Sequence, residues 1–319
     1  MTMTIDKCAV VTGASGQDGS YLCEYLLDRN YAVDAFVRPS TRSSHYANLT
    51  KCLDHPLFNM HHGDLCDYDT LRALVDLKPH ELYHLGAATQ VARSFECPTY
   101  YMDVIARATA SLLQLLRDVS PKTRMYFAGT SEMMAHNPHW KAQDETFPLH
   151  ANSPYGAAKI AAHLMCEQYR QAYGLFIVNG IAHNHESSRR PKQFVTRKLG
   201  LGVRAYLQNK TPVTLATVQT HRDWHHAKDT VRGMHLSLQH DVPGTYVFAS
   251  GTARSVRDFA VAVCKHFDVS YRDAIVLDDT DRRPLDVPYL CGNARKAYQV
   301  LHWQPEITWN ELVEDVCRE

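Results

Sequence analysis

The chain contains 319 residues, of which 45% are hydrophobic and 21% charged, and its 34 basic side chains balance 34 acidic ones. This composition is typical of a soluble globular protein, and zero net charge gives no reason to expect nucleic acid or a membrane surface as a partner. No apolar run approaches the ~20 residues that span a bilayer, and residues 1–5 lack the features of a signal peptide.

The cysteines and histidines bear on compartment and metal binding. Nine scattered cysteines without a Cys-x-x-Cys pair predict reduced thiols in a cytoplasmic protein. Among the nineteen histidines, His221, His225 and His226 have helical spacing, but no Glu or Cys completes a ligand set. We therefore expect no metal site.

The first predicted unit is a strand, a glycine-rich turn and a helix. Residues 8–12 form a short apolar run, Gly13, Gly16 and Gly19 follow at three-residue intervals, and residues 20–27 have helical periodicity. Glycines allow the backbone to approach a pyrophosphate, and the helix N-terminus attracts its charge. This order predicts a dinucleotide site, with a plain tight turn as the alternative.

The second predicted strand, residues 31–37, ends at Arg38. An NAD site usually has an acidic residue here, which accepts a hydrogen bond from the ribose 2′-hydroxyl. Arg38, with Ser40 and Arg42 close by, instead suits a 2′-phosphate, because guanidinium groups bind phosphate oxygens well. We expect NADP rather than NAD, with a solvated basic loop as the alternative.

Strands and helices continue to alternate through the first half of the chain. The predicted elements are a strand at 58–62, a helix at 71–77, a strand at 81–85, a helix at 106–119 and a strand at 124–129. This alternation predicts a parallel, doubly wound sheet, which binds ligands at its carboxyl edge. Asp64 follows the third strand at that edge, where its carboxylate can receive the adenine amino group.

Four residues at the same edge suggest acid–base chemistry. Thr130 and Glu132 follow the fifth strand, and Tyr155 and Lys159 open the next predicted helix. Residues four apart share one helix face, so we expect the Lys159 ammonium to lie beside the Tyr155 phenol and to lower its pKa. A phenol tuned in this way can exchange a proton with a sugar hydroxyl.

The pattern changes after residue 178. Residues 184–191 form a polar, basic loop, residues 194–198 open a helix, and further basic residues follow without regular strand–helix alternation. Such a segment suits a smaller lobe that grips a phosphorylated ligand, although each charge alone is equally compatible with a solvated surface. We predict an α/β fold with a Rossmann-like doubly wound parallel sheet in residues 1–180. A smaller C-terminal α/β substrate lobe takes up residues 181–319, with some segments returning to the first domain.

Six short motifs are spread along nearly the whole chain. They are residues 16–22 (Gly-Gln-Asp-Gly-Ser-Tyr-Leu), 130–132 (Thr-Ser-Glu), 153–159 (Ser-Pro-Tyr-Gly-Ala-Ala-Lys), 184–187 (Asn-His-Glu-Ser), 194–198 (Phe-Val-Thr-Arg-Lys) and 222–224 (Arg-Asp-Trp). Together they resemble the extended short-chain dehydrogenase/reductases and, most of all, the GDP-mannose 4,6-dehydratase family. The motifs at 184–187 and 194–198 are specific to the branch that acts on GDP-sugars.

The resemblance implies a lyase of nucleotide-sugar metabolism that converts GDP-mannose, or a close GDP-sugar, to the GDP-4-keto-6-deoxy sugar through bound NADP. Tyr155 would take the C4 hydroxyl proton while the C4 hydride passes to NADP. Glu132 would remove the C5 proton and return one to the hydroxyl that leaves C6, before the hydride returns to C6. Thr130 would hydrogen-bond O4, and Lys159 would hold the phenolate and the nicotinamide ribose.

The family positions also imply two sets of binding residues. Those implied at the cofactor, besides Tyr155 and Lys159, are Gly13, Gly16, Gln17, Asp18, Gly19, Arg38, Asp64, Leu65, Leu85, Ala87, Tyr100, His185 and Arg190. Those implied at the GDP-sugar are Ser131, Asn184, Glu186, Val195, Lys198, Arg222 and Arg283.

The chain departs from the family pattern in three places. Where the family has Leu-Tyr-Gly after the glutamate, this chain has Met133, Met134 and Ala135, which changes the expected shape of the sugar pocket. The loop after Arg38, which helps the dehydratases to form a tetramer, is shorter, so we expect a homo-oligomer that is either a dimer or a tetramer. An insertion is absent from the C-terminal lobe, where residues 283–288 resemble the shorter GDP-4-keto-6-deoxymannose reductases.

These departures leave two alternatives open. Within the enzymes, the alternative is a GDP-4-keto-6-deoxy-sugar reductase or an epimerase of the same fold. A reductase consumes NADPH, whereas a dehydratase shows no net redox change. The alternative from another class is a catalytically silent NADP-binding or regulatory protein, against which the intact set Thr130, Glu132, Tyr155 and Lys159 argues.

Overall fold

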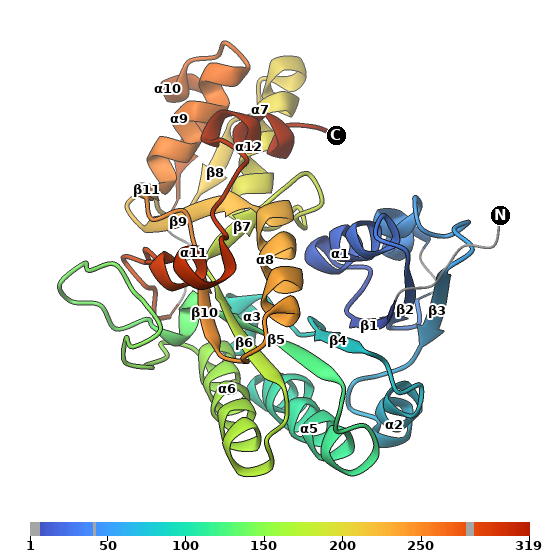
Figure 1. The fold of residues 1–319 in the computed structure, drawn as a ribbon. Helices are drawn as coiled ribbons and strands as arrows, with labels where there is room; N and C mark the ends of the chain where they lie inside the picture. The colour runs from blue at the N-terminus through green and yellow to red at the C-terminus, as the bar shows by residue number, and fades with distance from the viewer. Residues whose placement is uncertain (1–6, 41–42, 279–283) are drawn as a thin grey trace.

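A seven-stranded parallel sheet forms the centre of the protein (Figure 1). The computed structural model describes residues 7–40, 43–278 and 284–319. The strand order is β10-β6-β5-β4-β1-β2-β3, and every neighbouring pair is parallel. These strands are β1 (Lys7–Thr12), β2 (Tyr31–Val37), β3 (Phe58–His62), β4 (Glu81–His84), β5 (Arg124–Thr130), β6 (Ile177–Ala182) and β10 (Thr245–Phe248).

The strand order reverses between β1 and β4. The chain adds β2 and β3 on one side of β1 and then crosses to place β4 on the other side. Ligands of open α/β sheets bind outside the carboxyl ends of the strands at such a reversal. The predicted fold class is therefore confirmed, and the turn after β1 and the segment after β4 flank the expected ligand position.

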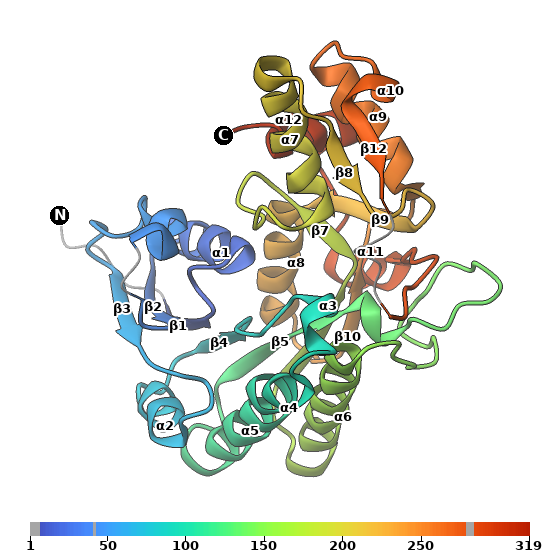
Figure 2. The ribbon, with the colours of Figure 1, turned by 180° about the vertical axis from the view of Figure 1, so that it is seen from behind.

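Helices cover both faces of the sheet (Figures 1 and 2). On one face α1 (Gln17–Leu27) packs against α8 (Ala227–Gln239), and residues of α11 (Arg295–Leu301) join their core. On the other face α2 (Tyr68–Asp76), α5 (Ala108–Val119) and α6 (Pro154–Tyr173) form a second core. Shorter segments are η1 (Ser43–Leu49), α3 (Val91–Ser94), α4 (Pro98–Tyr101), η2 (Met102–Arg107) and η3 (Ser131–Met133).

Two helices begin earlier than their sequence patterns predict. The helix expected from residue 71 starts at Tyr68, because the Asp67 carboxylate accepts a hydrogen bond from the Asp69 N–H (3.0 Å) and caps it. The helical structure expected from residue 106 already begins at Met102 with the π-helical segment η2, and α5 follows directly from Ala108.

The remaining elements form a smaller lobe above the carboxyl edge of the sheet (Figure 1). It has its own core, which includes Val203, Phe259 and Val313. None of the helices in the described residues is long and apolar enough to cross a membrane. The lobe consists of a three-stranded sheet of β7 (Asn184–Glu186), β9 (His221–His226) and β11 (Ala253–Ser255), a pair formed by β8 (Val213–Leu215) and β12 (Ile275–Leu277), and helices α7 (Val195–Asn209), α9 (Val256–His266), α10 (Tyr271–Ala274) and α12 (Trp309–Val316).

Candidate active site

A cavity of about 420 Å³ lies at the carboxyl edge, where the strand order reverses. It is lined by the turn after β1, the ends of β2 and β4, and residues 190, 191, 193 and 194 of the smaller lobe. Of the residues expected at the cofactor, Tyr155, Lys159 and His185 are outside this lining. Those that line it are Gly13, Gly16, Gln17, Asp18, Gly19, Arg38, Asp64, Leu65, Leu85, Ala87, Tyr100 and Arg190.

The glycine turn is built by close backbone packing. Gly13 has a positive φ of 71°, and a Cβ atom added there would lie 2.8 Å from the Cα atom of Gly86. A side chain at Gly13 would push the turn away from the segment after β4, and one at Gly86 would collide with Leu65. Because both residues are glycines, the base of the cavity consists of backbone and lies next to the N-terminus of α1. Such a surface binds a pyrophosphate.

The far end of the cavity presents a guanidinium group. Arg38 follows β2, and its Nη1 atom donates a hydrogen bond to the Tyr100 hydroxyl (3.1 Å). The acidic residue of β2, Asp34, is instead paired with His61 (2.8 Å) and is not among the lining residues. The charge on this wall is therefore the positive charge of Arg38, which suits a phosphate group.

Several lining residues have no clear signal in the sequence. His45 and Arg93 lie in segments after strand ends, and the His45 ring contacts the Ser15 hydroxyl of the glycine turn (3.3 Å). Ser15 belongs to the turn motif and was therefore within reach of sequence reasoning. Gln193 and Phe194 reach the cavity from the smaller lobe, which only the folded chain reveals.

Thr130 and Glu132 lie under the first turn of α6. Thr130 ends β5, and its hydroxyl oxygen accepts a hydrogen bond from the Glu132 N–H (3.3 Å). A Cβ atom at Gly156 would lie 2.8 Å from the Glu132 carbonyl oxygen. The glycine that follows Tyr155 thus allows α6 to approach the segment that carries Glu132, and the structure brings Thr130, Glu132 and Tyr155 together.

The predicted effect of Lys159 on Tyr155 is wrong in this structure. Burial raises the pKa of the Tyr155 phenol, and a hydrogen bond with Thr130 only partly offsets this rise, which the Glu132 charge reinforces. The Lys159 ammonium donates to the Ala128 carbonyl oxygen of β5 (2.6 Å), and burial lowers the pKa of Lys159 to about 8. The two residues share a helix, but the ammonium is directed at the sheet.

Tyr155 nevertheless lies next to the cavity. Its ring contacts Tyr101, with centroids 6.3 Å apart and nearly perpendicular planes, and Tyr101 lines the cavity. At this point only the Tyr101 side chain lies between Tyr155 and the cavity.

The departure at residues 133–135 lies in the core. Met133 and Met134 pack against Ile181 and Val247, and Ala135 packs in a separate small cluster. All three side chains are buried and none lines the cavity. In this structure they fill the core behind Glu132, and the expected change in the shape of the sugar pocket stays a prediction.

The residues expected at the substrate divide into accessible and buried groups. Lys198 is exposed on α7, whereas Glu186 and Arg222 are buried and hold protein partners. Glu186 accepts from the Thr196 hydroxyl (2.6 Å), and Arg222 donates to the Val287 carbonyl oxygen (2.7 Å). The others are Ser131, buried in η3, Asn184, half-buried in β7, Val195, the first residue of α7, and Arg283, which lies outside the described residues.

Metal-binding side chains do not gather in this region. Within residues 7–40, 43–278 and 284–319, no group of three or more His, Cys, Asp or Glu side chains is arranged to hold a metal ion.

Comparison with known proteins adds sequence relatives that span nearly the whole chain. Residues 10–316 match the model of a family described as GDP-mannose 4,6 dehydratase. GDP-mannose 4,6 dehydratase 1 of Arabidopsis thaliana is 40% identical over 97% of this chain and 88% of its own length. The GDP-mannose 4,6-dehydratase of Vibrio cholerae is 36% identical over 98% of this chain and 93% of its own length.

Solved structures share the fold at lower sequence identity. The dTDP-glucose 4,6-dehydratase DesIV of Streptomyces venezuelae, solved with NAD and TYD bound, has a TM-score of 0.86 at 22% identity and covers 97% of this chain and 95% of its own. The UDP-glucuronic acid 4-epimerase of Bacillus cereus has a TM-score of 0.86 at 20% identity and covers 97% of this chain and 98% of its own. At these identities the likeness concerns the fold alone.

Proposed function

The chain belongs to the GDP-mannose 4,6-dehydratase family, and from this premise we propose that it removes water from GDP-mannose or a close GDP-sugar. The product is the GDP-4-keto-6-deoxy sugar, and NADP is the retained cofactor. The observation that carries the proposal is the placement of Glu132 beside Tyr155 at the carboxyl edge. A dehydratase needs a second acid–base group next to the tyrosine, because a proton must leave C5.

The cavity supports a dinucleotide cofactor. Its glycine turn opens a helix, and the cavity lies at the strand-order reversal, where such sheets bind dinucleotides. Arg38 supports NADP over NAD, because its guanidinium suits a 2′-phosphate where NAD sites present a carboxylate.

The proposed chemistry assigns a task to each of the four residues. A bound nicotinamide would supply the hydride acceptor and donor for transfer of the C4 hydrogen to C6. Tyr155 takes the proton of the C4 hydroxyl, and Thr130 holds that oxygen. Glu132 removes the proton at C5 and protonates the hydroxyl that leaves C6, while Lys159 orients the nicotinamide ribose and stabilises the phenolate.

The raised pKa of Tyr155 and the lowered pKa of Lys159 describe the protein without ligands. An ammonium that turns from the Ala128 carbonyl oxygen toward the phenol would lower the phenol pKa. We therefore propose that Lys159 changes its partner when the site is filled.

Replacement of Glu132 by Gln tests the assignment of the C5 base. The amide keeps the shape of the side chain but accepts no proton, so we expect water loss and solvent exchange at C5 to fall by at least about 100-fold. Product formation and deuterium incorporation from heavy water, followed by mass spectrometry, measure both. Retained cofactor serves as the control for folding, and normal dehydration by this variant would refute the role of Glu132.

Replacement of Arg38 by Ala tests the choice of cofactor. Loss of the guanidinium should weaken NADP by about 10- to 100-fold, since charge-assisted hydrogen bonds to phosphate contribute roughly 1.5–3 kcal/mol. NAD has no 2′-phosphate and should bind almost as before. Titration calorimetry with both dinucleotides gives the comparison, and an equal loss for both would remove the argument for NADP.

Three further properties belong to the proposal. We propose a homo-oligomer, either a dimer or a tetramer, as the family resemblance supports, and a cytoplasmic location, which the nine free cysteines support. The division into a cofactor domain at 1–180 and a mainly substrate-binding lobe at 181–319 is proposed in the same way, with the return of α8 and β10 to the sheet domain.

A further inference from the structure

The cofactor cavity has walls from two distant parts of the chain. One wall is the turn between β1 and α1, and the other is formed by residues 190, 191, 193 and 194, which follow β7 in the smaller lobe. A dinucleotide in this cavity lies between the lobes, so its release depends on how firmly the two walls are joined.

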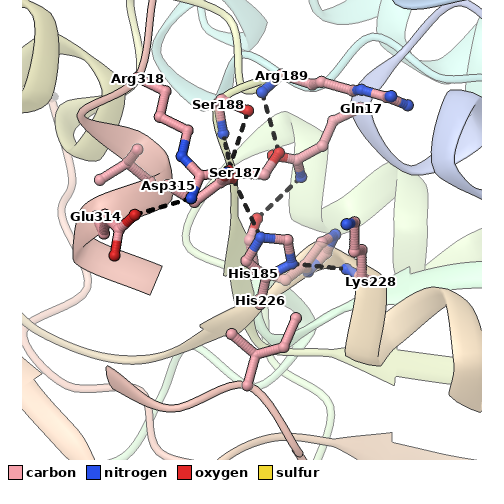
Figure 3. Close-up of polar contacts among 12 residues, drawn as sticks. Gln17, His185, Ser187, Ser188, Arg189, His226, Lys228, Glu314, Asp315 and Arg318 are labelled. Atoms are coloured by element: carbon pink, nitrogen blue, oxygen red, sulfur yellow. Dashed lines mark hydrogen bonds and ion pairs between the residues drawn. The ribbon is translucent and has the colours of Figure 1, made fainter. Parts of the chain in front are cut away.

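Gln17 joins the turn to β7 and to the residue that follows it (Figure 3). Its amide nitrogen donates to the His185 carbonyl oxygen (3.0 Å), and its amide oxygen accepts from the Ser187 hydroxyl (2.9 Å). Ser187 is fully buried and Gln17 is only 6% exposed, so water does not replace these bonds easily. The Gln17 side chain is thereby engaged with the protein at both of its polar atoms.

Asp18 makes an ion pair across the same boundary. Its carboxylate accepts from Nε2 of His185 (2.8 Å), and Nδ1 of His185 faces the His183 carbonyl oxygen (2.7 Å). Since a carbonyl oxygen and a carboxylate only accept hydrogen bonds, both ring nitrogens carry hydrogen and His185 is an imidazolium. Burial alone would lower the pKa of His185, but the Asp18 charge and hydrogen bond leave it raised.

Arg189 extends the connection along α1. Its guanidinium donates to the Ser20 hydroxyl (3.0 Å) and to the Glu24 carboxylate (2.5 Å), and it lies over the Tyr21 ring (3.9 Å from its centroid). The Arg189 N–H also donates to the Ser187 hydroxyl oxygen (3.1 Å). The loop after β7 is thus attached to the first two turns of α1.

We propose that Gln17, Asp18, His185, Ser187 and Arg189 form an interlobe latch that retains the dinucleotide between rounds of catalysis. The inference rests on the proposed function, in which the reduced cofactor must stay in place until C6 receives the hydride. His185, Ser187 and Arg189 do not line the cavity. They are positioning residues, which act on the cofactor through the turn.

Two adjacent serines provide a matched test. Ser187 bonds to Gln17 of the turn, whereas the Ser188 hydroxyl lies 3.4 Å from Asp315 of α12, away from the turn (Figure 3). Each is replaced by Ala in the full chain, which is loaded with NADPH and diluted into excess NADP. The decay of bound NADPH fluorescence then gives the dissociation rate without any sugar nucleotide.

Ser187→Ala leaves the buried Gln17 oxygen without its donor, which weakens the latch by roughly 1–2 kcal/mol. We expect dissociation to become about 5- to 30-fold faster, whereas Ser188→Ala should change it by less than about 2-fold. In a separate experiment the protein is preloaded with NADP and mixed with GDP-mannose, and the rate of this single turnover should be unaffected in both variants. A purely structural role for Ser187 would lower the melting temperature without this separation of dissociation from turnover.

A second variant, Arg189→Met, keeps the packing over Tyr21 but removes the bonds to Ser20 and Glu24. It should also release NADPH faster, and it provides the answer if Ser187→Ala folds poorly. Equal dissociation rates in the wild type and in whichever of these variants folds would overturn the latch alone. Normal retention by the wild type without dehydratase activity would overturn only the proposed function, and absence of dinucleotide binding would overturn both.

Discussion

Lys159 illustrates how an active-site residue opposes stability. The residue is only 4% exposed, and its ammonium donates to the Ala128 carbonyl oxygen and lies 5.0 Å from the centre of the Phe127 ring. Burial lowers its pKa to about 8 from an ordinary value of 10.5. A buried charge without a counter-ion is costly, and catalytic sites commonly retain such groups. Lys159, which we propose to hold the phenolate, thus lowers the stability of the folded protein.

Replacement of Lys159 by Met should stabilise the cofactor-free protein at pH 7 by about 1–3 kcal/mol while abolishing activity. The unfolded lysine keeps its proton up to about its ordinary pKa of 10.5, whereas the folded one loses it near 8. Between these values the unfolded state binds more protons, so wild-type stability rises with pH relative to the variant. Urea denaturation at pH 7 and pH 10 measures this, and an advantage of Met that does not shrink at pH 10 would contradict the explanation.

The sequence predicts which site residues lie at the same edge of the sheet, but not the individual contacts that their side chains make. The chain order placed Thr130, Glu132 and Tyr155 at one edge of a sheet, and the structure brings them together. The pairing of Asp18 with His185 joins residues 167 positions apart, and no local pattern reports such a contact. The direction of the Lys159 ammonium depends on the β5 backbone, which a helix-face argument does not include.

At the scale of elements, the turn between β1 and α1 depends on close backbone packing. Gly13→Ala would place a methyl group 2.8 Å from Gly86 at a φ of 71°. Because overpacking costs roughly 1–3 kcal/mol, we expect dinucleotide affinity to fall by about 5- to 150-fold. Gly174 ends α6 with a φ of 64°, but no atom lies within 4 Å of its added Cβ. Gly174→Ala is therefore the matched control for backbone strain.

The control variant should lose only about 1 kcal/mol of stability and bind the dinucleotide normally. Titration calorimetry and thermal unfolding of the two variants separate strain from packing. Equal dinucleotide affinity in both variants would show that the contact between Gly13 and Gly86 does not shape the site.

The sheet strands were more predictable than the smaller lobe. β2 and β3 match their predicted residues: β2 is a mostly apolar, largely buried run, and β3, at the edge of the sheet, alternates Phe58 and Met60 with polar residues. β7, β8, β11 and β12 have three residues each and are defined by their pairing with distant segments. The early start of α2 follows from a single capping carboxylate, and the π-helical segment before α5 has no periodic signature.

At the scale of the whole molecule, the smaller lobe is attached to the cofactor domain by side chains as well as by the chain itself. The latch ties the loop after β7 to α1, and Asp315 of α12 accepts from the Ser188 N–H (2.8 Å) and from His226 (3.1 Å) on the other side of that loop. The loop that supplies Arg190 to the cavity is thus held from both sides (Figure 3). This arrangement fits an enzyme that keeps one cofactor through a complete reaction cycle.

The central claim, an internal dehydration with a retained cofactor, is tested most directly by anaerobic incubation of the purified protein with GDP-mannose and no added NADP. Mass spectrometry of the sugar nucleotide and absorbance of the nicotinamide are followed together. Loss of one water (about 18 Da) with no net formation of NADPH is the result that two-way hydride transfer at one site requires. Unchanged GDP-mannose, together with consumption of NADPH when the 4-keto-6-deoxy sugar is supplied, would contradict it and assign the protein to the reductases.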